Sequence, residues 1–133
     1  MEDKFDGVRG LQQALRDGIE TTRDNTGITF TLAVNYGGRA EIVDAARRMI
    51  EDGLEPEQVD ETTFASYLYA PEVPEVDLVI RTSGELRVSN FLLWQIAYAE
   101  FYVTDTLWPD FSPEEFRQAI ASFAIRSRRR GGV

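Results

Sequence analysis

The chain has 133 residues, with 14 lysines and arginines against 23 aspartates and glutamates, so its formal net charge is −9. This length suits a single domain over residues 1–133 with a core of ordinary size, and the acidic excess disfavours nucleic acid and more than peripheral membrane contact. The lack of cysteine and histidine excludes disulfides, thiolate metal sites and an imidazole base, so any metal would be a hard cation such as Mg²⁺. No apolar run approaches the roughly 20 residues that span a bilayer, and no signal-peptide pattern occurs at Met1, so we expect a cytoplasmic protein.

The first half of the chain predicts a helix, a strand and a second helix. Apolar residues recur every three or four positions over residues 8–22, which is typical of an amphipathic helix. Residues 28–35 alternate, are β-branched and include a continuous apolar run, which predicts a central strand. A glycine pair then leads into a helix over residues 39–52, which Gly53 closes as its C-terminal cap. The side chains expected to face inward from this helix are Ile42, Val43, Ala46, Met49 and Ile50.

The second half predicts two more strands and three more helices. Asp60 caps a short helix, and a buried strand follows over residues 77–80. Residues 90–99 predict a helix that begins at Ser89, and residues 101–104 predict another short strand. A capping box over residues 112–115, with proline at the first helical position, starts a last helix that reaches about residue 129.

This alternation indicates an α/β fold with a parallel sheet flanked by helices. Strands separated by helices pair in parallel through right-handed crossovers. Three strands make a narrow sheet, whose edge should be apolar and exposed. We therefore expect either a partner chain or poor solubility.

The segment after the strand at residues 77–80 has the composition of an anion-binding loop. Arg81 ends the strand, Gly84 makes a turn, and Arg87 and Ser89 follow. Ligands of α/β proteins bind beyond the carboxyl ends of the strands, and a guanidinium matches phosphate oxygens. Ser89 would add a hydroxyl donor and cap the next helix, whose first N–H groups would face the same anion. A polar loop with two solvated arginines explains the residue types about equally well.

A resemblance to a known family favours the first interpretation. The run DLVIRTSGELRVSNFLLWQIAYAEFYVTDTLWPDF, residues 77–111, closely resembles the C-terminal signature of the cis-prenyltransferases, typified by undecaprenyl diphosphate synthase. NTGITFTLAVNYGGRAEIVDA, residues 25–45, and the tail RSRRRGG, residues 126–132, agree with it. The resemblance covers essentially this whole chain but about the C-terminal half of a typical family member. It implies a partial cis-prenyltransferase-type fold.

The family's N-terminal motif MDGNGRWA does not occur in this sequence, and residues 7–10 are no substitute for it. In the family, the aspartate of that motif is essential for catalysis and its backbone holds the allylic diphosphate. The resemblance therefore implies half of an active site, with no confident catalytic residue in this chain. We expect a piece of a longer isoprenyl transferase, a non-catalytic subunit of a heteromeric enzyme, or an inactive diphosphate-binding fragment.

The resemblance also implies roles for individual residues. Arg81, Arg87 and Ser89 correspond to residues that hold the diphosphate of isopentenyl diphosphate. Arg129 and Gly131 match an R-x-G near the C-terminus that reaches the partner's diphosphate site across a dimer, although a basic last helical turn would explain the arginines too. A homodimer, or a heterodimer with a longer homologue, is thus implied.

Glu100 resembles the family's Mg²⁺-associated carboxylate, the alternative being a solvent-facing glutamate at a helix end. Residues 97–99 are predicted to be buried, which would make an unpaired carboxylate beside them costly. Leu86 stands where some bacterial members carry a histidine near the metal, so any contribution from that position is absent.

Other noticeable residues have a structural explanation. Core packing is the better account of the aromatic side chains of Phe91, Trp94 and Trp108, although they could line a prenyl site. Asn35 and Arg39 are predicted to support the site, and the aspartates near Trp108 to satisfy loop backbone. The implied reaction condenses isopentenyl diphosphate with an allylic diphosphate, with Mg²⁺, to a cis-polyprenyl diphosphate.

Overall fold

The computed structural model describes residues 3–126, and the chain divides into two units between Val34 and Asn35. In the first unit, α1 (Asp3–Thr22) is the predicted amphipathic helix, and it begins earlier than residue 8. Residues 28–35 form no strand, so that prediction is wrong. Ile28 and Phe30 are 95% and 80% exposed. A strand needs a neighbour for its backbone N–H and C=O groups, and the described residues give this segment no ladder partner.

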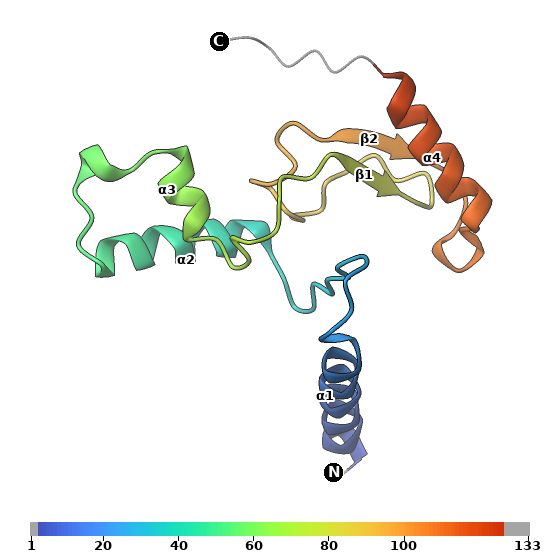
Figure 1. The fold of residues 1–133 in the computed structure, drawn as a ribbon, viewed down its shortest axis with the longest axis horizontal. Coiled ribbons are helices and arrows are strands. Elements are labelled where there is room, and N and C mark those ends of the chain that lie inside the picture. The colour runs from blue at the N-terminus through green and yellow to red at the C-terminus, as the bar shows by residue number, and fades with distance from the viewer. Residues whose placement is uncertain (1–2, 127–133) are drawn as a thin grey trace. The chain divides into compact units, whose positions relative to one another are not determined.

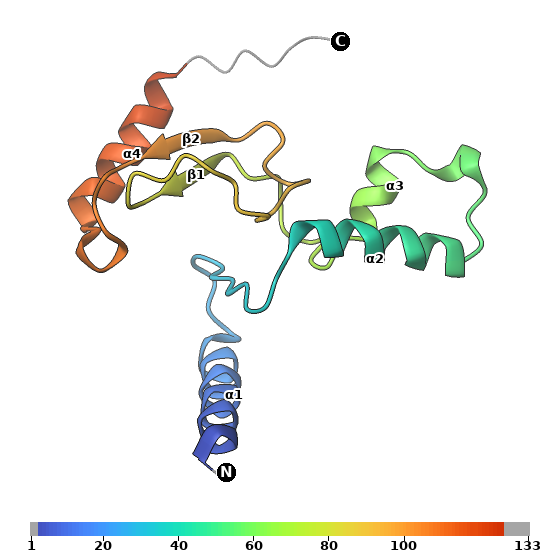
Figure 2. The ribbon, with the colours of Figure 1, turned by 180° about the vertical axis from the view of Figure 1, so that it is seen from behind.

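The second unit contains a parallel strand pair and three α-helices (Figures 1 and 2). In it, β1 (Leu78–Arg81) pairs in parallel with β2 (Glu100–Val103), while α4 (Pro113–Ile125) packs on β2 and α2 (Gly38–Glu51) packs on α3 (Glu61–Ser66). Two short 3-10 helices, η1 (Pro56–Gln58) and η2 (Trp108–Asp110), lie in the loops. The α/β class with a parallel sheet flanked by helices is confirmed. The sheet of the described residues has two strands instead of the predicted three.

The predicted helix ends form for the expected local reasons. After α2, Gly53 adopts a φ of 72°, and the Leu54 N–H donates to the Met49 carbonyl at 3.1 Å, which is a Schellman motif with Gly53 just beyond the C-cap. Asp60 accepts from a backbone N–H of α3. At α4, Ser112 forms the predicted capping box, but the helix ends at Ile125, short of residue 129.

The predicted helix over residues 90–99 does not form, and this stretch consists of turns. Ser89, Asn90 and Leu92 have φ values of 54°, 61° and 46°, in the left-handed region that a right-handed helix cannot contain. Asn90 is held there by α2, because its carbonyl accepts from the Gly38 N–H at 2.8 Å and its Oδ1 from the Arg39 N–H at 2.9 Å. A long-range cap has therefore replaced the local helix.

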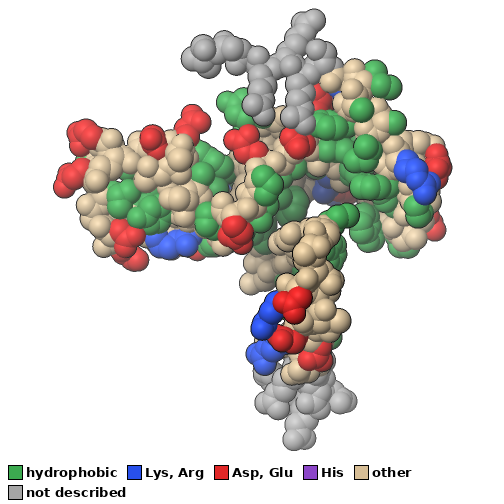
Figure 3. Space-filling view, in the orientation of Figure 1, with side chains coloured by type: hydrophobic (Ala, Val, Ile, Leu, Met, Phe, Trp, Pro, Cys, Tyr) green, Lys and Arg blue, Asp and Glu red, His purple; other side chains and the backbone are tan. Residues whose placement is uncertain are grey.

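Little of the described structure is core, contrary to the expectation of an ordinary one. The buried apolar side chains among those described are Ala45, Met49, Leu68, Ile96 and Ala119. Val43 and Ile50, predicted to face inward from α2, are 48% and 78% exposed. Hydrophobic side chains gather on the surface over β1, β2 and α4 (Figure 3). No described helix is long and apolar enough to cross a membrane.

Candidate functional site

The loops after β1 and β2 are joined at the carboxyl edge of the strand pair. Register pairs Arg81 with Val103, and beyond it the Ser83 and Gly84 N–H groups donate to the carbonyls of Thr106 and Thr104, each at 2.9 Å. Gly84 has a φ of 64°, and a Cβ there would lie 2.8 Å from an Asp105 carboxylate oxygen. Only glycine fits this turn without strain.

The first turn of α4 fixes the loop after β2. Glu115 accepts from the Thr106 hydroxyl and from the Ser112 N–H, the latter at 3.0 Å. The Thr106 hydrogen bond, followed by the Ser112 backbone bond, holds the pKa of the Glu115 carboxyl below its ordinary value. Both loops at this edge are therefore anchored by hydrogen bonds.

The two predicted diphosphate-binding arginines lie together, joined by Glu85. The Arg81 Nη2 donates to Glu85 Oε2 at 2.9 Å, and Arg87 donates to Oε2 through Nε at 3.0 Å and to Oε1 through Nη2 at 2.5 Å. The Arg81 side chain is 25% exposed and its buried Nε has no hydrogen-bond partner among residues 3–126, whereas Arg87 is 68% exposed. Two cations share one anion at the end of a strand.

Ser89 does not cap a helix as predicted. It is exposed, its φ is 54°, and the residues after it form turns. The free helix N-terminus expected to face the anion is therefore missing from this loop. The next residue, Asn90, does cap a helix, but that helix is α2.

Glu100 lies at the other end of the ladder from Arg81. Register pairs Glu100 with Leu78, three residues before Arg81, which is about 10 Å at the rise of a strand. Its Oε2 accepts from Arg126 Nη1 at 3.0 Å, and its side chain is 27% exposed. The predicted burial of the preceding residues is wrong, since Tyr98 is 80% exposed. Among the described residues no three acidic side chains group together as metal ligands would.

The predicted C-terminal residues Arg129 and Gly131 lie outside the described residues. Arg126 is the last residue described, and its backbone is extended with a ψ of 124° as it ends α4. Besides Glu100, its guanidinium donates to the Phe101 carbonyl at 2.8 Å. The end of α4 is thus tied to the start of β2.

Sequence reasoning missed a buried carboxylate on α2, which connects this helix to the approach to β1. Glu41 on α2 is 1% exposed and accepts from the Tyr36 hydroxyl, from the Tyr69 N–H at 3.0 Å and from Gln95 Nε2 at 3.2 Å. Burial, followed by the hydrogen bond to Glu41, raises the pKa of Tyr36 well above its ordinary value. The Val76 N–H donates to the Gln95 carbonyl at 3.1 Å, so the network reaches the approach to β1.

Asn90 and Glu85 were also missed. Asn90 could be recognised as a short polar residue that tolerates left-handed backbone, in a segment otherwise typical of a helix. Glu85 could be recognised from its spacing between two arginines. Glu41 gave no usable signal, because a glutamate in the first turn of a helix is ordinarily exposed.

The aromatic residues divide between packing and exposure. Trp94 packs on Phe64, with ring centroids 4.4 Å apart, as core packing predicts. Trp108 is 72% exposed and stacks on Phe111 at 6.1 Å, so the core interpretation is wrong for Trp108. Phe91 is 40% exposed, and its ring packs edge-on against the ring of Tyr36.

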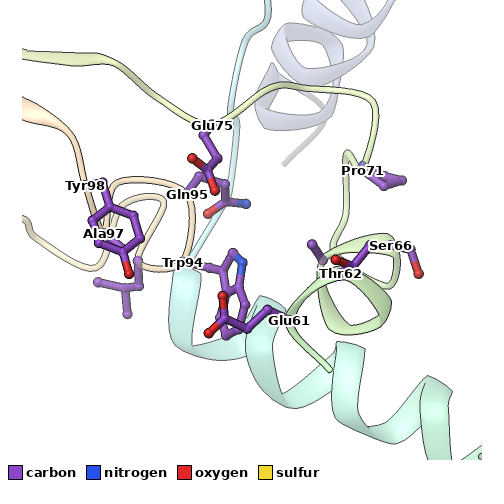
Figure 4. Close-up of a pocket in the computed structure, with 11 residues that line it drawn as sticks. Glu61, Thr62, Ser66, Pro71, Glu75, Trp94, Gln95, Ala97 and Tyr98 are labelled. Carbon is purple, nitrogen blue, oxygen red and sulfur yellow. The ribbon is translucent and has the colours of Figure 1, made fainter. Parts of the chain in front are cut away.

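One cavity of the second unit has neither arginine in its lining. Its volume is about 600 Å³, and its walls include Trp94, Tyr98 and the carboxylates of Glu61 and Glu75 (Figure 4). Carboxylates repel a diphosphate, so this cavity does not suit one. The cluster of Arg81, Glu85 and Arg87 carries a net positive charge, which suits a diphosphate.

Comparison with known proteins gives consistent matches. A family model described as "putative undecaprenyl diphosphate synthase" matches residues 7–131. An isoprenyl transferase of Fusobacterium nucleatum is 55% identical over 123 residues, 92% of this chain and 52% of that protein. An undecaprenyl diphosphate synthase of Escherichia coli K12 is 50% identical over 127 residues, 92% of this chain and 50% of that protein. The chain spans about half the length of these curated relatives.

Solved structures agree. Lavandulyl diphosphate synthase from Lavandula x intermedia, in complex with dimethylallyl diphosphate, matches with a TM-score of 0.82 and 44% identity, over 89% of this chain and 52% of that one. A "probable undecaprenyl diphosphate synthase" from Campylobacter jejuni matches with a TM-score of 0.77 and 36% identity, over 99% of this chain and 58% of that one. The similarity therefore extends to three dimensions.

Proposed function

The chain belongs to the undecaprenyl diphosphate synthase family of isoprenyl transferases, and from this premise we propose that it holds the isopentenyl diphosphate site of such an enzyme. The reaction would join isopentenyl diphosphate to an allylic diphosphate and give a cis-polyprenyl diphosphate. This chain would supply the homoallylic clamp, whereas the allylic clamp would come from the family's N-terminal motif, which this sequence does not contain.

The observation that carries the proposal is that Arg81, the last residue of β1, and Arg87, beyond that strand, both bind Glu85. Arginine forks bind phosphate oxygens through charge-assisted hydrogen bonds, and ligands of parallel sheets bind at this edge. The exposed Ser89 hydroxyl, two residues after Arg87, would add a weaker donor.

The proposed chemistry assigns limited roles to the residues of this chain. The arginines would bind and orient the diphosphate of isopentenyl diphosphate, so that its double bond faces the allylic carbon. Mg²⁺, when bound, would assist the departure of the allylic diphosphate. Glu100 would offer a single carboxylate to such an ion, in the manner of Mg²⁺ sites completed by substrate phosphates.

A partner chain and a cytoplasmic site of action belong to the same proposal. Arg129 and Gly131 would reach the diphosphate site of a second chain, in a homodimer or in a heterodimer with a longer homologue. The exposed apolar surface over β1, β2 and α4 suits coverage by further protein.

Titration calorimetry with isopentenyl diphosphate tests the clamp. We expect Arg81→Ala or Arg87→Ala to weaken binding by about 1.5–3 kcal/mol, the worth of hydrogen bonds from a charged group. Arg117→Ala is the matched control, because Arg117 is an exposed arginine on α4, also ion-paired with a glutamate. Equal affinity in Arg81→Ala and Arg117→Ala would remove the assignment.

Incorporation of isopentenyl diphosphate, with farnesyl diphosphate and Mg²⁺, tests the larger activity. We expect the purified chain to bind substrate but to turn over only with a longer homologue present. Turnover by the chain alone would contradict the division of the site. Binding without turnover in any mixture would favour an inactive diphosphate-binding fragment.

A further inference from the structure

We propose that Glu85 is a positioning residue for diphosphate binding, which holds both clamp arginines in place before the ligand arrives. This inference rests on the proposed function of Arg81 and Arg87. The carboxylate receives three hydrogen bonds from the two guanidinium groups, two on Oε2 and one on Oε1. The cluster has two positive charges and one negative charge, so it keeps a net charge of +1 with which to attract an anion.

The backbone around Glu85 is fixed from outside. Gly84 is pinned to the loop after β2 by its N–H bond to the Thr104 carbonyl, and the Glu85 N–H contacts the Thr82 carbonyl at 3.5 Å. The Glu85 side chain is 38% exposed and thus less free than that of Arg87, at 68%. Glu85 is therefore a fixed acceptor to which the exposed side chain of Arg87 can hydrogen-bond.

Arg87 has the most to gain from this anchor. An exposed arginine without a partner samples many rotamers, and a ligand that needs one of them must bear the entropy of ordering it. The fork of Arg87 meets both carboxylate oxygens, which fixes the plane of the guanidinium as well as its place. Its remaining N–H donors would then face the ligand already oriented.

In the opposite role, Glu85 competes with the diphosphate for the arginines. That role predicts the opposite change in diphosphate affinity when the carboxylate is neutralised. A competing carboxylate weakens ligand binding, so its neutralisation would strengthen it. A positioning carboxylate strengthens ligand binding, so its neutralisation would weaken it. Glutamine is the informative replacement, because it keeps the shape but has one acceptor oxygen and turns an NH₂ donor toward guanidinium donors.

The experiment is calorimetry of isopentenyl diphosphate and of inorganic pyrophosphate at fixed ionic strength. We expect Glu85→Gln to weaken both by roughly 5- to 150-fold, the order of the cost of ordering two long side chains. Glu85→Asp keeps the charge and should recover part of the loss. Glu114→Gln is the matched control, because it changes the net charge equally at the exposed Glu114–Arg117 pair, and it should bind as the wild type does.

A second measurement needs no ligand. In nitrogen-15 NMR, the Arg87 Nε–H should exchange slowly with water in the wild type and in Glu114→Gln, and faster in Glu85→Gln. Equal or tighter diphosphate binding by Glu85→Gln would overturn the positioning role, as would unchanged Nε–H exchange. If Glu85→Gln unfolds, Glu85→Ala, which also removes the carboxylate, decides by the same criteria.

The failure of this inference differs from the failure of the proposed function. A wild-type chain that binds neither diphosphate contradicts the proposed function, and the NMR comparison then still decides whether Glu85 orders the arginines. A wild-type chain that binds isopentenyl diphosphate while Glu85→Gln binds equally well contradicts the role of Glu85 alone.

Discussion

Replacing Glu41 with glutamine tests whether a single buried carboxylate joins α2 to the segments that lead into β1. In the structure it accepts from Tyr36, from the Tyr69 N–H and from Gln95, and it is 1% exposed. Hydrogen bonds to a charged group contribute about 1.5–3 kcal/mol each, and buried donors left unpaired cost about 1–3 kcal/mol. Glutamine keeps one acceptor oxygen but loses the charge. Its NH₂ group would face the donor groups of Tyr36, Tyr69 and Gln95.

We therefore expect Glu41→Gln to lower the free energy of unfolding by about 3 kcal/mol, and Glu41→Ala by roughly 3–5 kcal/mol. The loss from alanine is limited because the phenol and the amide can turn toward water, whereas the Tyr69 N–H is fixed in the backbone. The control is Glu51→Gln on the exposed end of the same helix, which should change stability by less than about 0.5 kcal/mol.

Urea unfolding followed by far-ultraviolet circular dichroism and by tryptophan fluorescence measures these differences, provided that both probes report one transition. Trp108→Phe, at an exposed position, gives a background in which Trp94 alone reports on the network. A Glu41→Gln chain as stable as Glu51→Gln would refute the argument that this carboxylate is needed where it is buried.

The remaining predictions use pH and glycine substitution. The pKa of Glu115 lies below its unfolded value, so its contribution to stability is complete above pH ~4.5 and is lost as the pH falls through the folded pKa; Glu115→Gln should flatten acid unfolding. The pKa of Tyr36 is raised, so its contribution is complete below pH ~10 and declines above it; Tyr36→Phe should remove this alkaline slope in a melting-temperature series. A Cβ at Gly38 would lie 2.8 Å from the Leu93 side chain, so Gly38→Ala should lose about 1–3 kcal/mol by urea unfolding, whereas Gly18→Ala, with open space in α1, should gain about 0.5–1 kcal/mol.

Local signals predicted the helix ends well. The capping box at Ser112, the cap at Asp60 and the left-handed Gly53 all form where the residue types place them. Each depends on atoms within a few residues, and no long-range contact displaces it at these three positions. The arginine cluster was predictable for a similar reason, since Arg81 ends a strand and Arg87 follows one turn later.

Long-range interactions decided the elements that sequence reasoning missed. Residues 90–99 have the composition of a helix, yet Asn90 caps α2 and Gln95 bonds to Glu41, which outweighs a local helix. Residues 28–35 have the composition of a strand, but β structure requires a neighbour, and propensity cannot supply one. In both cases the outcome depends on residues far away in the chain.

Register is the decisive case for the site, because it determines which of the predicted ligand groups can meet. The sequence indicates that Arg81 ends one strand and that Glu100 precedes another, but we did not predict from it which residues of the two strands are paired. The observed pairing of Leu78 with Glu100 puts the carboxylate at the amino end and the guanidinium at the carboxyl end of one ladder. A slip of the pairing would also turn β2 over, so this register and the packing of α4 on β2 depend on each other. Glu100 and Arg81 therefore lie at opposite ends of the ladder, about 10 Å apart along the strands.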